Sequence, residues 1–518
     1  MLDWTSGYVA DIGYTYGYYT ELNPLRVALG FLNAGLAPPA STSVCELGFG
    51  QGISINVHAA AQHGSQYWGT DFNPAQAGHA RTLAEASGAD ARLFDQSFEE
   101  FCSRTDLPEF DYIGLHGIWS WISDENRHII VDFLRRRLKV GGVLYISYNT
   151  HPGWAATLPM RHLLTQHAET MGSSGEGIVH RIDAAIEFAD KLLALNPLYI
   201  QANPQVAERF KAIKTQNRHY VAHEYFNRDW HPMHFSTMLG WLAPAKLGYA
   251  CSANFMDSVP EINLTADQQT LLKGIADSNF RETTFDMIVN QQFRRDYWVK
   301  GARRLNPVER GEALRKLRVV LCAPRDGISL TVKGAAGEAT LSESVYKPLL
   351  DLLSDHVPRT LGEIENALQG VATLPLLVQA ALILSGTGSL NMAQEDQAAA
   401  NAREASDKLN AAIMHKALGS ADIAYLASPV MGSGVTVNQF EQLFLLASQQ
   451  GNGQPEEWAA YAWQTLSTLG KKLIKEGKTL DSPAENIAEL TEQAKQFAKG
   501  KFPMLKKLGV VQTGAADQ

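Results

Sequence analysis

Cysteines are few and scattered in this sequence. The four that occur, Cys45, Cys102, Cys251 and Cys322, are far apart and form no CxxC pair. A disulfide framework and a zinc knuckle both depend on closely spaced cysteines, so neither is expected. The pattern is typical of a protein from a reducing cytoplasm.

Excess positive charge and long apolar runs are also missing. The formal net charge is -9 and the pI about 5.9, whereas a broad nucleic-acid surface needs a basic footprint. No stretch of about 18 uninterrupted apolar residues occurs, and the first residues lack the basic start and apolar core of a signal peptide. We therefore expect a soluble cytoplasmic protein with no membrane span and no nucleic-acid partner.

Short apolar runs alternate with helical stretches over residues 42–150. This alternation is typical of parallel βαβ units, with helices on both faces of a sheet. Two later segments, LGYACSANF (247–255) and FRRDYWVKG (293–301), are interpreted as strands that close the same sheet. The strands expected in the alternating part are TSVCELG (42–48), QYWGTDF (66–72), ARLFD (91–95), FDYIGLHGI (110–118) and GVLYISYN (142–149).

A chain of 518 residues is too long for one hydrophobic core. We predict a Rossmann-like core from residues 1–154 and 235–304, interrupted by a helical insertion at 155–234. A middle domain, 305–400, has the element order of a winged helix, with a possible short hairpin at its glycine-rich turn. Residues 401–518 are expected to be helical, and the Ala- and Gln-rich tract at their start is either helix or linker.

The strongest local signal is VCELGFGQG, residues 44–52. A strand ends at Glu46, and three alternate glycines then make a tight turn into a helix. Glycines allow a ligand close to the backbone, but NAD-binding proteins share this feature. The acidic residue at the end of the strand distinguishes NAD from a ligand with an ammonium group, because a carboxylate would repel the pyrophosphate of NAD and would attract an ammonium. S-adenosylmethionine carries an ammonium group and no phosphate.

With this motif the sequence resembles the class I S-adenosylmethionine-dependent methyltransferases. The resemblance implies that Asp71, in YWGTDF, holds the ribose hydroxyls, and that Asp95, in LFDQSF, lies beside the adenine amine. The alternative for both aspartates is turn capping. The residues assigned to S-adenosylmethionine are Tyr14, Glu46, Gly48, Phe49, Gly50, Asp71, Phe72, Asp95, Gln96, Ser97 and His116.

A narrower resemblance covers more of the chain. YTYGYYTELNP, SYNTHPGW, YVAHEYFN and FRRDYWVKG are similar to segments of bacterial methyltransferases that carry a methyltransferase regulatory domain. Within that group, the length and layout resemble rickettsial protein-lysine methyltransferases that modify outer-membrane proteins. The resemblance implies a protein substrate with a lysine acceptor, and dimerisation through the insertion as a hypothesis.

Four residues are candidates for catalysis: His116, Trp119, Tyr18 and Tyr148. His116 and Trp119 follow the fourth strand, where methyltransferases place acceptor-binding groups, and a histidine there would take a proton from an ammonium. Tyr148 ends the fifth strand, and Tyr18 belongs to an aromatic segment that covers the cofactor. The alternative for His116 and Trp119 is a packed aromatic loop, and for Tyr18 an aromatic segment packed on the core. Tyr148 would otherwise only close the turn before Pro152.

Methyl transfer needs no metal, and none is predicted. HPMH (His231, His234) has ligand-like spacing without a third ligand, so it is interpreted as structural. Two functions remain as alternatives to lysine methylation. One is methylation of a sugar, glycan or small molecule, which favours a closed pocket. The other is a non-catalytic module that binds the cofactor and recruits a partner.

Overall fold

The computed structural model describes residues 13, 15–172, 175 and 177–511. Its centre is a seven-stranded sheet with the order β3-β2-β1-β4-β5-β7-β6. The strands are β1 (Ser43–Leu47), β2 (Gln66–Thr70), β3 (Ala91–Phe94), β4 (Phe110–Leu115), β5 (Leu138–Asn149), β6 (Leu247–Ser252) and β7 (Phe293–Lys300). The first five run parallel, while β7 is antiparallel to both β5 and β6. The two late strands predicted to close the sheet are thus β6 and β7.

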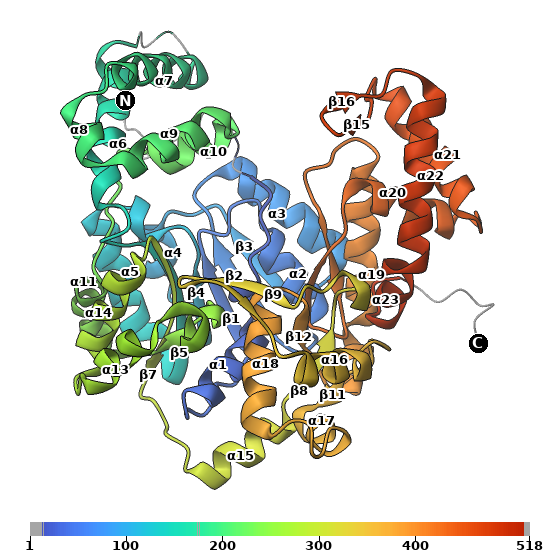
Figure 1. Cartoon of the computed structure of the whole chain (residues 1–518), viewed down its shortest axis with the longest axis horizontal. Helices are drawn as coiled ribbons and strands as arrows, with labels where there is room; N and C mark the ends of the chain where they lie inside the picture. Colours follow the sequence, from blue (N-terminus) through green and yellow to red (C-terminus); the bar gives the residue numbers. More distant parts are fainter. Residues whose placement is uncertain (1–12, 14, 173–174, 176, 512–518) are drawn as a thin grey trace.

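Helices cover both faces of this sheet (Figure 1). The strands are buried on both sides, and successive residues alternate between the faces: Val44 packs in the core on the side of α1, whereas Cys45 packs on the side of α5. The helices of this part are α1 (Val27–Asn33), α2 (Ile53–Ala61), α3 (Pro74–Ser87), α4 (Phe98–Ser103) and α5 (Asp124–Arg137). Single 3-10 turns are η1 (Thr20–Leu22), η2 (Pro24–Arg26) and η3 (Trp119–Trp121).

The segment between β5 and β6 is helical. Its helices up to α10 gather in a separate lobe with a core of its own, beside the sheet (Figure 1), whereas the last two elements, α11 and η5, pack in the core of the sheet with α5. They are η4 (Ala155–Thr157), α6 (Leu158–Thr170), α7 (Ile178–Ala194), α8 (Leu198–Ala202), α9 (Pro204–Thr215), α10 (Arg218–Tyr225), α11 (Phe235–Leu242) and η5 (Ala243–Ala245). Between β6 and β7 lie η6 (Phe255–Ser258), α12 (Pro260–Asn263), α13 (Ala266–Gly274) and α14 (Ser278–Val289).

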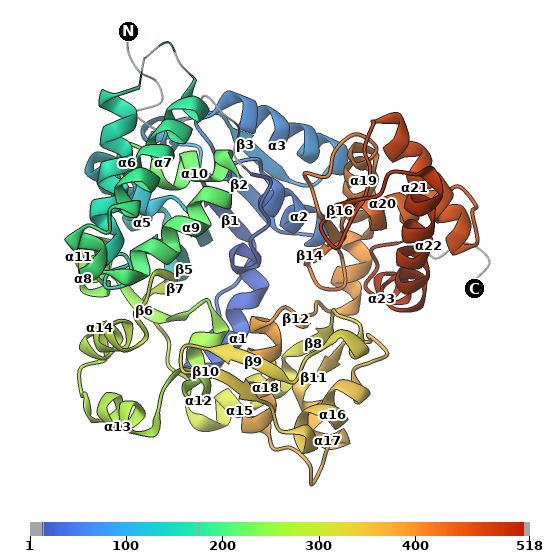
Figure 2. The same ribbon diagram turned by 45° about the horizontal axis from the view of Figure 1, so that its top comes forward.

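The middle region forms a small α/β unit, at the bottom of Figure 2. Its elements are α15 (Pro307–Lys316), β8 (Arg318–Leu321), η7 (Arg325–Gly327), β9 (Thr331–Gly334), β10 (Gly337–Thr340), α16 (Glu343–Leu352), β11 (Arg359–Thr360), α17 (Leu361–Ala367), α18 (Leu374–Gly386) and β12 (Leu390–Met392). The predicted hairpin at the glycine-rich turn is wrong, because β12 pairs with β8 from the start of the unit. The hairpin of this region is β9–β10 instead.

The C-terminal region packs directly against helices of the seven-stranded sheet. Its elements are α19 (Asp396–Ala417), β13 (Tyr425–Ser428), β14 (Ser433–Thr436), α20 (Gln439–Gln449), α21 (Pro455–Thr468), β15 (Ile474–Lys475), β16 (Lys478–Thr479), α22 (Pro483–Lys499) and α23 (Lys501–Lys507). The Ala- and Gln-rich tract is the long helix α19, which contacts α2 and α3 (Figures 1 and 2). Every residue of α2 is buried as a result.

No helix among the described residues combines the length and the apolarity needed to cross a membrane.

Candidate functional site

The main cavity lies where the parallel strands end. Four of its wall segments directly follow β1, β2, β3 and β4, which is the edge at which open α/β sheets bind ligands. The space between its walls, including the open solvent at its mouth, is about 1270 Å³. The lining residues are Thr15, Gly17, Tyr19, Glu46, Gly48, Phe49, Gly50, Gln51, Asp71, Phe72, Gln76, Gln96, Ser97, Phe98, His116, Gly117, Ile118, Trp121, Ile122, Ser123, Asn126 and Asp229.

The glycine turn after β1 keeps the cavity open. Gly48 has φ +76°, and a Cβ there would lie 2.4 Å from Cδ1 of Ile118 across the cavity. Gly52 has φ +73°, and a Cβ there would lie 2.3 Å from Cβ of Ala80 in α3. A side chain at either position would be strained and would collide with its neighbour, so glycine is required at both.

Asp71 fixes this turn to the second strand. Its carboxylate accepts a hydrogen bond from the backbone N–H of Gly50 at 2.8 Å and another from Asn73 at 3.0 Å. Burial raises the pKa of Asp71 to about 6 in spite of these bonds. Burial, and then the neighbouring Asp71, also raise the pKa of Glu46 well above its usual value. Two carboxylates thus share a cavity in which both are costly to ionise.

The charge of the wall has one sign. Glu46, Asp71 and Asp229 line the cavity, and its lining includes no lysine and no arginine among the described residues. The Glu46 carboxylate has no hydrogen-bonding or ion-pair partner in the part of the chain that the structure describes. Such a wall disfavours phosphate groups and favours a cationic ligand.

His116 is held between two tyrosines. Its ring stacks on Tyr19 with 3.7 Å between centroids, and its Nδ1 lies 2.7 Å from the hydroxyl oxygen of Tyr145. Burial lowers the pKa of His116 to about 4, so the imidazole is neutral at physiological pH. This disagrees with its predicted role as a base for an ammonium, because a group with so low a pKa binds a proton poorly.

Most of the residues predicted to hold a cofactor come together here. Tyr14 lies outside the described residues. Asp95 does not line the cavity: its side chain is 48% exposed and pairs with Arg81 of α3 at 2.5 Å. The nine that do line it are Glu46, Gly48, Phe49, Gly50, Asp71, Phe72, Gln96, Ser97 and His116.

Three of the four predicted catalytic residues lie elsewhere. Trp119 is fully buried against α5 and packs edge-on against Trp241. Tyr18 faces the C-terminal region, and its hydroxyl accepts a hydrogen bond from Gly434. Tyr148 is buried and donates to Asp296 at 2.7 Å. None of the three is part of the cavity wall, so the role in catalysis predicted for them does not fit the structure.

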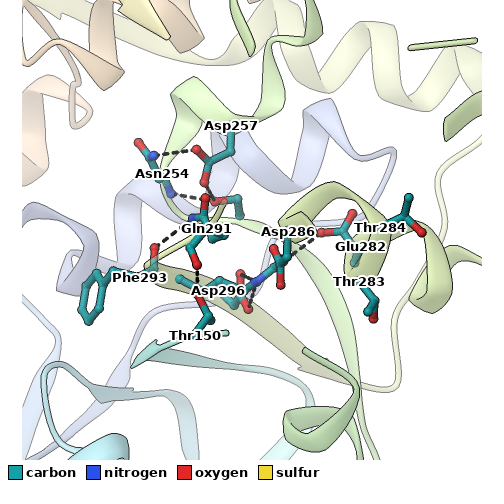
Figure 3. Close-up of polar contacts among 12 residues, drawn as sticks. Thr150, Asn254, Asp257, Glu282, Thr283, Thr284, Asp286, Gln291, Phe293 and Asp296 are labelled. Carbon is teal, nitrogen blue, oxygen red and sulfur yellow. Dashed lines mark hydrogen bonds and ion pairs between the residues drawn. The ribbon is translucent and has the colours of Figure 1, made fainter. Parts of the chain in front are cut away.

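Tyr148 belongs to a buried charge cluster, part of which is drawn in Figure 3. There Glu282 and Asp286 from α14 converge with Asp296 from β7. Their common partner is the Arg294 guanidinium, at 2.8 Å from Glu282, 2.6 Å from Asp286 and 2.9 Å from Asp296. Through these ion pairs the cluster connects α14, in the segment between β6 and β7, to strand β7 of the seven-stranded sheet.

Several residues of the cavity wall belong to no recognisable sequence motif. Tyr19 and Trp121 come from the two aromatic segments that were expected near the site, the N-terminal tyrosines and the residues after the fourth strand, and Phe98 follows Ser97 in a helix-capping sequence. Asp229 comes from the end of the helical insertion, and nothing in its surroundings marks it as part of the site. Among the described residues, no group of three or more His, Cys, Asp or Glu side chains that could hold a metal ion was found, at His231 and His234 or elsewhere.

Known protein families match two parts of the chain. Residues 44–142 match the family described as "Methyltransferase domain", and residues 217–300 match the "Predicted methyltransferase regulatory domain". An uncharacterized protein of Synechocystis sp., sll1526, is 41% identical over 515 residues, which cover 98% of this chain and 100% of the relative. The chain belongs to the class I S-adenosylmethionine-dependent methyltransferases.

Other relatives of this methyltransferase come from Rickettsia. RP789 of Rickettsia prowazekii is 24% identical over 312 residues, covering 58% of this chain and 54% of that protein. The structure of PKMT2 from Rickettsia typhi in complex with AdoHcy superimposes with a TM-score of 0.68 at 18% identity, over 95% of this chain and 99% of that one. At this identity the likeness is one of fold. It includes the C-terminal half, for which sequence motifs offered no guide.

Proposed function

We propose that this methyltransferase transfers a methyl group to the side-chain amine of lysine in a protein. The observation that carries the proposal is the charge of the cavity wall: three carboxylates, and no basic side chain among its described residues. An amine acceptor enters as an ammonium ion, which such a wall attracts. A phosphate-bearing acceptor, such as a lipid-linked glycan, would be repelled.

Glu46, Asp71 and the residues after β3 are proposed to hold S-adenosylmethionine. The open cradle at Gly48 and the unpaired Glu46 fit a ligand with an ammonium group and no phosphate. When bound, this cofactor supplies an electrophilic methyl group on a sulfonium. Gln96 and Ser97 line the same part of the cavity, and we assign them to the adenine end in place of Asp95.

The acceptor side is proposed to be formed by Tyr19, Trp121 and Asp229. Aromatic faces stabilise an ammonium through cation–π contact and exclude water from the amine. Asp229 is half-buried at the rim, with 24% of its side chain exposed. Its carboxylate would guide the ammonium into the cavity. His116 serves as a neutral wall that positions Tyr19.

Label transfer tests the acceptor. With tritiated S-adenosylmethionine and a bacterial lysate, we expect labelled protein whose acid hydrolysate contains methylated lysine. Acetylating the lysate's amines beforehand should abolish the labelling. Label in a lipid or sugar fraction, or in another amino acid, would overturn the lysine proposal while leaving the methyltransferase class intact.

Asp229→Asn should raise the KM for the lysine acceptor by about tenfold, because it removes the carboxylate that attracts the ammonium. The Kd for S-adenosylhomocysteine should stay within about twofold, since Asp229 is assigned to the other side of the cavity. Steady-state kinetics and calorimetry measure the two quantities. The exposed Asp267→Asn variant, far from the cavity, is the matched control. An unchanged KM would remove Asp229 from the acceptor site.

Cofactor binding should release protons below about pH 7, because the pKa of Asp71 is raised to about 6 in the free protein and a cationic ligand lowers it. Affinity for S-adenosylmethionine should therefore rise as the pH increases through 6 and level off above it. Calorimetry at one pH in two buffers of different ionisation enthalpy counts the protons released. Equal heats in both buffers, with a constant Kd over this range, would contradict the assignment.

A further inference from the structure

The segment of residues 15–19, here called the strap, has two faces with different contacts. Thr15, Gly17 and Tyr19 line the cavity. Tyr16 and Tyr18 point the other way: the ring of Tyr16 packs edge-on against His79 of α3, and Tyr18 packs against the C-terminal region. This alternation is that of an extended chain, in which successive side chains leave on opposite sides.

The C-terminal region holds the strap through Tyr18. The Tyr18 hydroxyl accepts a hydrogen bond from the backbone N–H of Gly434 in β14 at 2.8 Å and shares another with Nε2 of His58 in α2 at 3.0 Å. Its ring packs against Tyr425 of β13, with centroids 5.0 Å apart. Burial lowers the pKa of His58 to about 3, so its imidazole is neutral at physiological pH.

Tyr19, the residue after Tyr18, links this contact to the cavity wall. The backbone N–H of Tyr19 donates to the hydroxyl of Ser54 at 2.8 Å, and the Tyr19 ring stacks on His116. A second connection runs beside the glycine turn: Lys416 of α19 lies 2.8 Å from Nε2 of His79, whose Nδ1 lies 2.9 Å from the carbonyl oxygen of Gln51. Both connections link the C-terminal region to cavity-lining residues.

We propose that the β13–β14 hairpin of the C-terminal region positions the strap over the cofactor cavity, with Tyr18 as the positioning residue. The C-terminal half thus has a part in cofactor binding without touching the ligand. The inference rests on the proposal that this cavity holds S-adenosylmethionine.

Two substitutions, one from each side of the contact, test it. Tyr18→Phe keeps the ring and leaves the Gly434 N–H and the His58 nitrogen without their partner. Gly434→Ala places a Cβ 2.9 Å from Cζ of Tyr18, and the ring must move because it is the more mobile partner. Two matched controls lie in the same region. Tyr461→Phe removes a hydroxyl that accepts a hydrogen bond from the Gln450 side chain, and Gly453→Ala adds a Cβ with no neighbouring atom within 4 Å.

We expect the Kd for S-adenosylhomocysteine to rise about tenfold in Tyr18→Phe and in Gly434→Ala, and to stay within about twofold in both controls. Hydrogen exchange of the amides of residues 15–19 should quicken in the same two variants, while exchange in α19 stays unchanged. This readout separates a loosened strap from a general loss of stability.

Normal affinity and normal exchange in the strap would overturn the inference, even if the variants melted at a lower temperature. If the wild-type protein did not bind S-adenosylhomocysteine, the assignment of the cavity would fail first. The exchange data would then still decide whether the hairpin holds the strap.

Discussion

Glu46→Gln should weaken binding of S-adenosylhomocysteine about 50-fold, by ~2 to 3 kcal/mol, without lowering the stability of the free protein. The carboxylate is buried, with 6% of the residue exposed, and the described cavity wall offers it no cation. Its charge is therefore costly in the free protein and finds a counterion in the ligand's ammonium group. Replacing it with an amide of the same shape removes both the cost and the attraction.

A smaller ligand serves as the control for this variant. Methylthioadenosine has the adenosine part of the cofactor and lacks the amino-acid part. Calorimetry should show its affinity changing less than about threefold in Glu46→Gln. An equal loss for both ligands would mean that the substitution disturbs the cavity as a whole. Undiminished binding of S-adenosylhomocysteine would show that Glu46 does not contact the ammonium.

The strands of the core and the cofactor turn could be predicted because their signals are local. Glu46 and Gly48 belong to one continuous motif, and Asp71 ends the next strand along the chain. The ends of parallel strands meet at one edge of the sheet, so a correct strand order brings these residues together without further information. The two late strands that close the sheet, β6 and β7, could also be predicted from their own segments.

The acceptor side could not be predicted in the same way. Trp119 and Trp121 stand two positions apart in a single 3-10 turn, yet Trp119 packs under α5 and Trp121 lines the cavity. A single turn is too short for the spacing of its apolar residues to show which side chain faces the ligand. Asp229 reaches the cavity only because the helical insertion folds back on the sheet, and a tertiary contact of this kind leaves no local pattern.

Buried strands conceal side-chain direction as well. Tyr148 lies in β5, whose last eight residues are all buried, so no polar and apolar alternation tells which face it occupies. In the middle region, element order was misleading for a related reason. The strand that pairs with β12 is β8, which precedes the helices, and strand pairing cannot be inferred from order alone.

Arg294→Met should lower the free energy of unfolding at pH 8 by ~3 to 5 kcal/mol, the largest stability loss we expect for one substitution. Arg294 is 4% exposed, and its carboxylate partners Asp286 and Asp296 are 2% and 1% exposed. Methionine fills much of the same space but leaves both carboxylates buried without a cation. Chemical denaturation followed by tryptophan fluorescence, at pH 8 and at pH 5, measures the effect.

The pH dependence of the free energy of unfolding shows whether buried charge causes the loss of stability in Arg294→Met. Burial raises the pKa of Asp286 to about 7 even with Arg294 present, and the pKa of Asp296 is also raised. The folded state thus binds protons more tightly than the unfolded state, and stability increases as the pH falls through the folded pKa. Without Arg294 these carboxylates should protonate more readily, so the difference from the wild type should shrink at pH 5.

Two further variants complete the argument. Replacing both aspartates with asparagine in the Arg294→Met protein should recover part of the stability at pH 8, since the uncompensated charges are gone. Arg315→Met, which breaks an exposed ion pair with Glu365, should leave the free energy of unfolding nearly unchanged. If the loss of stability in Arg294→Met is independent of pH and is not rescued, packing and not charge holds the segment between β6 and β7 to the sheet. Such a result would leave Tyr148 with a packing role only.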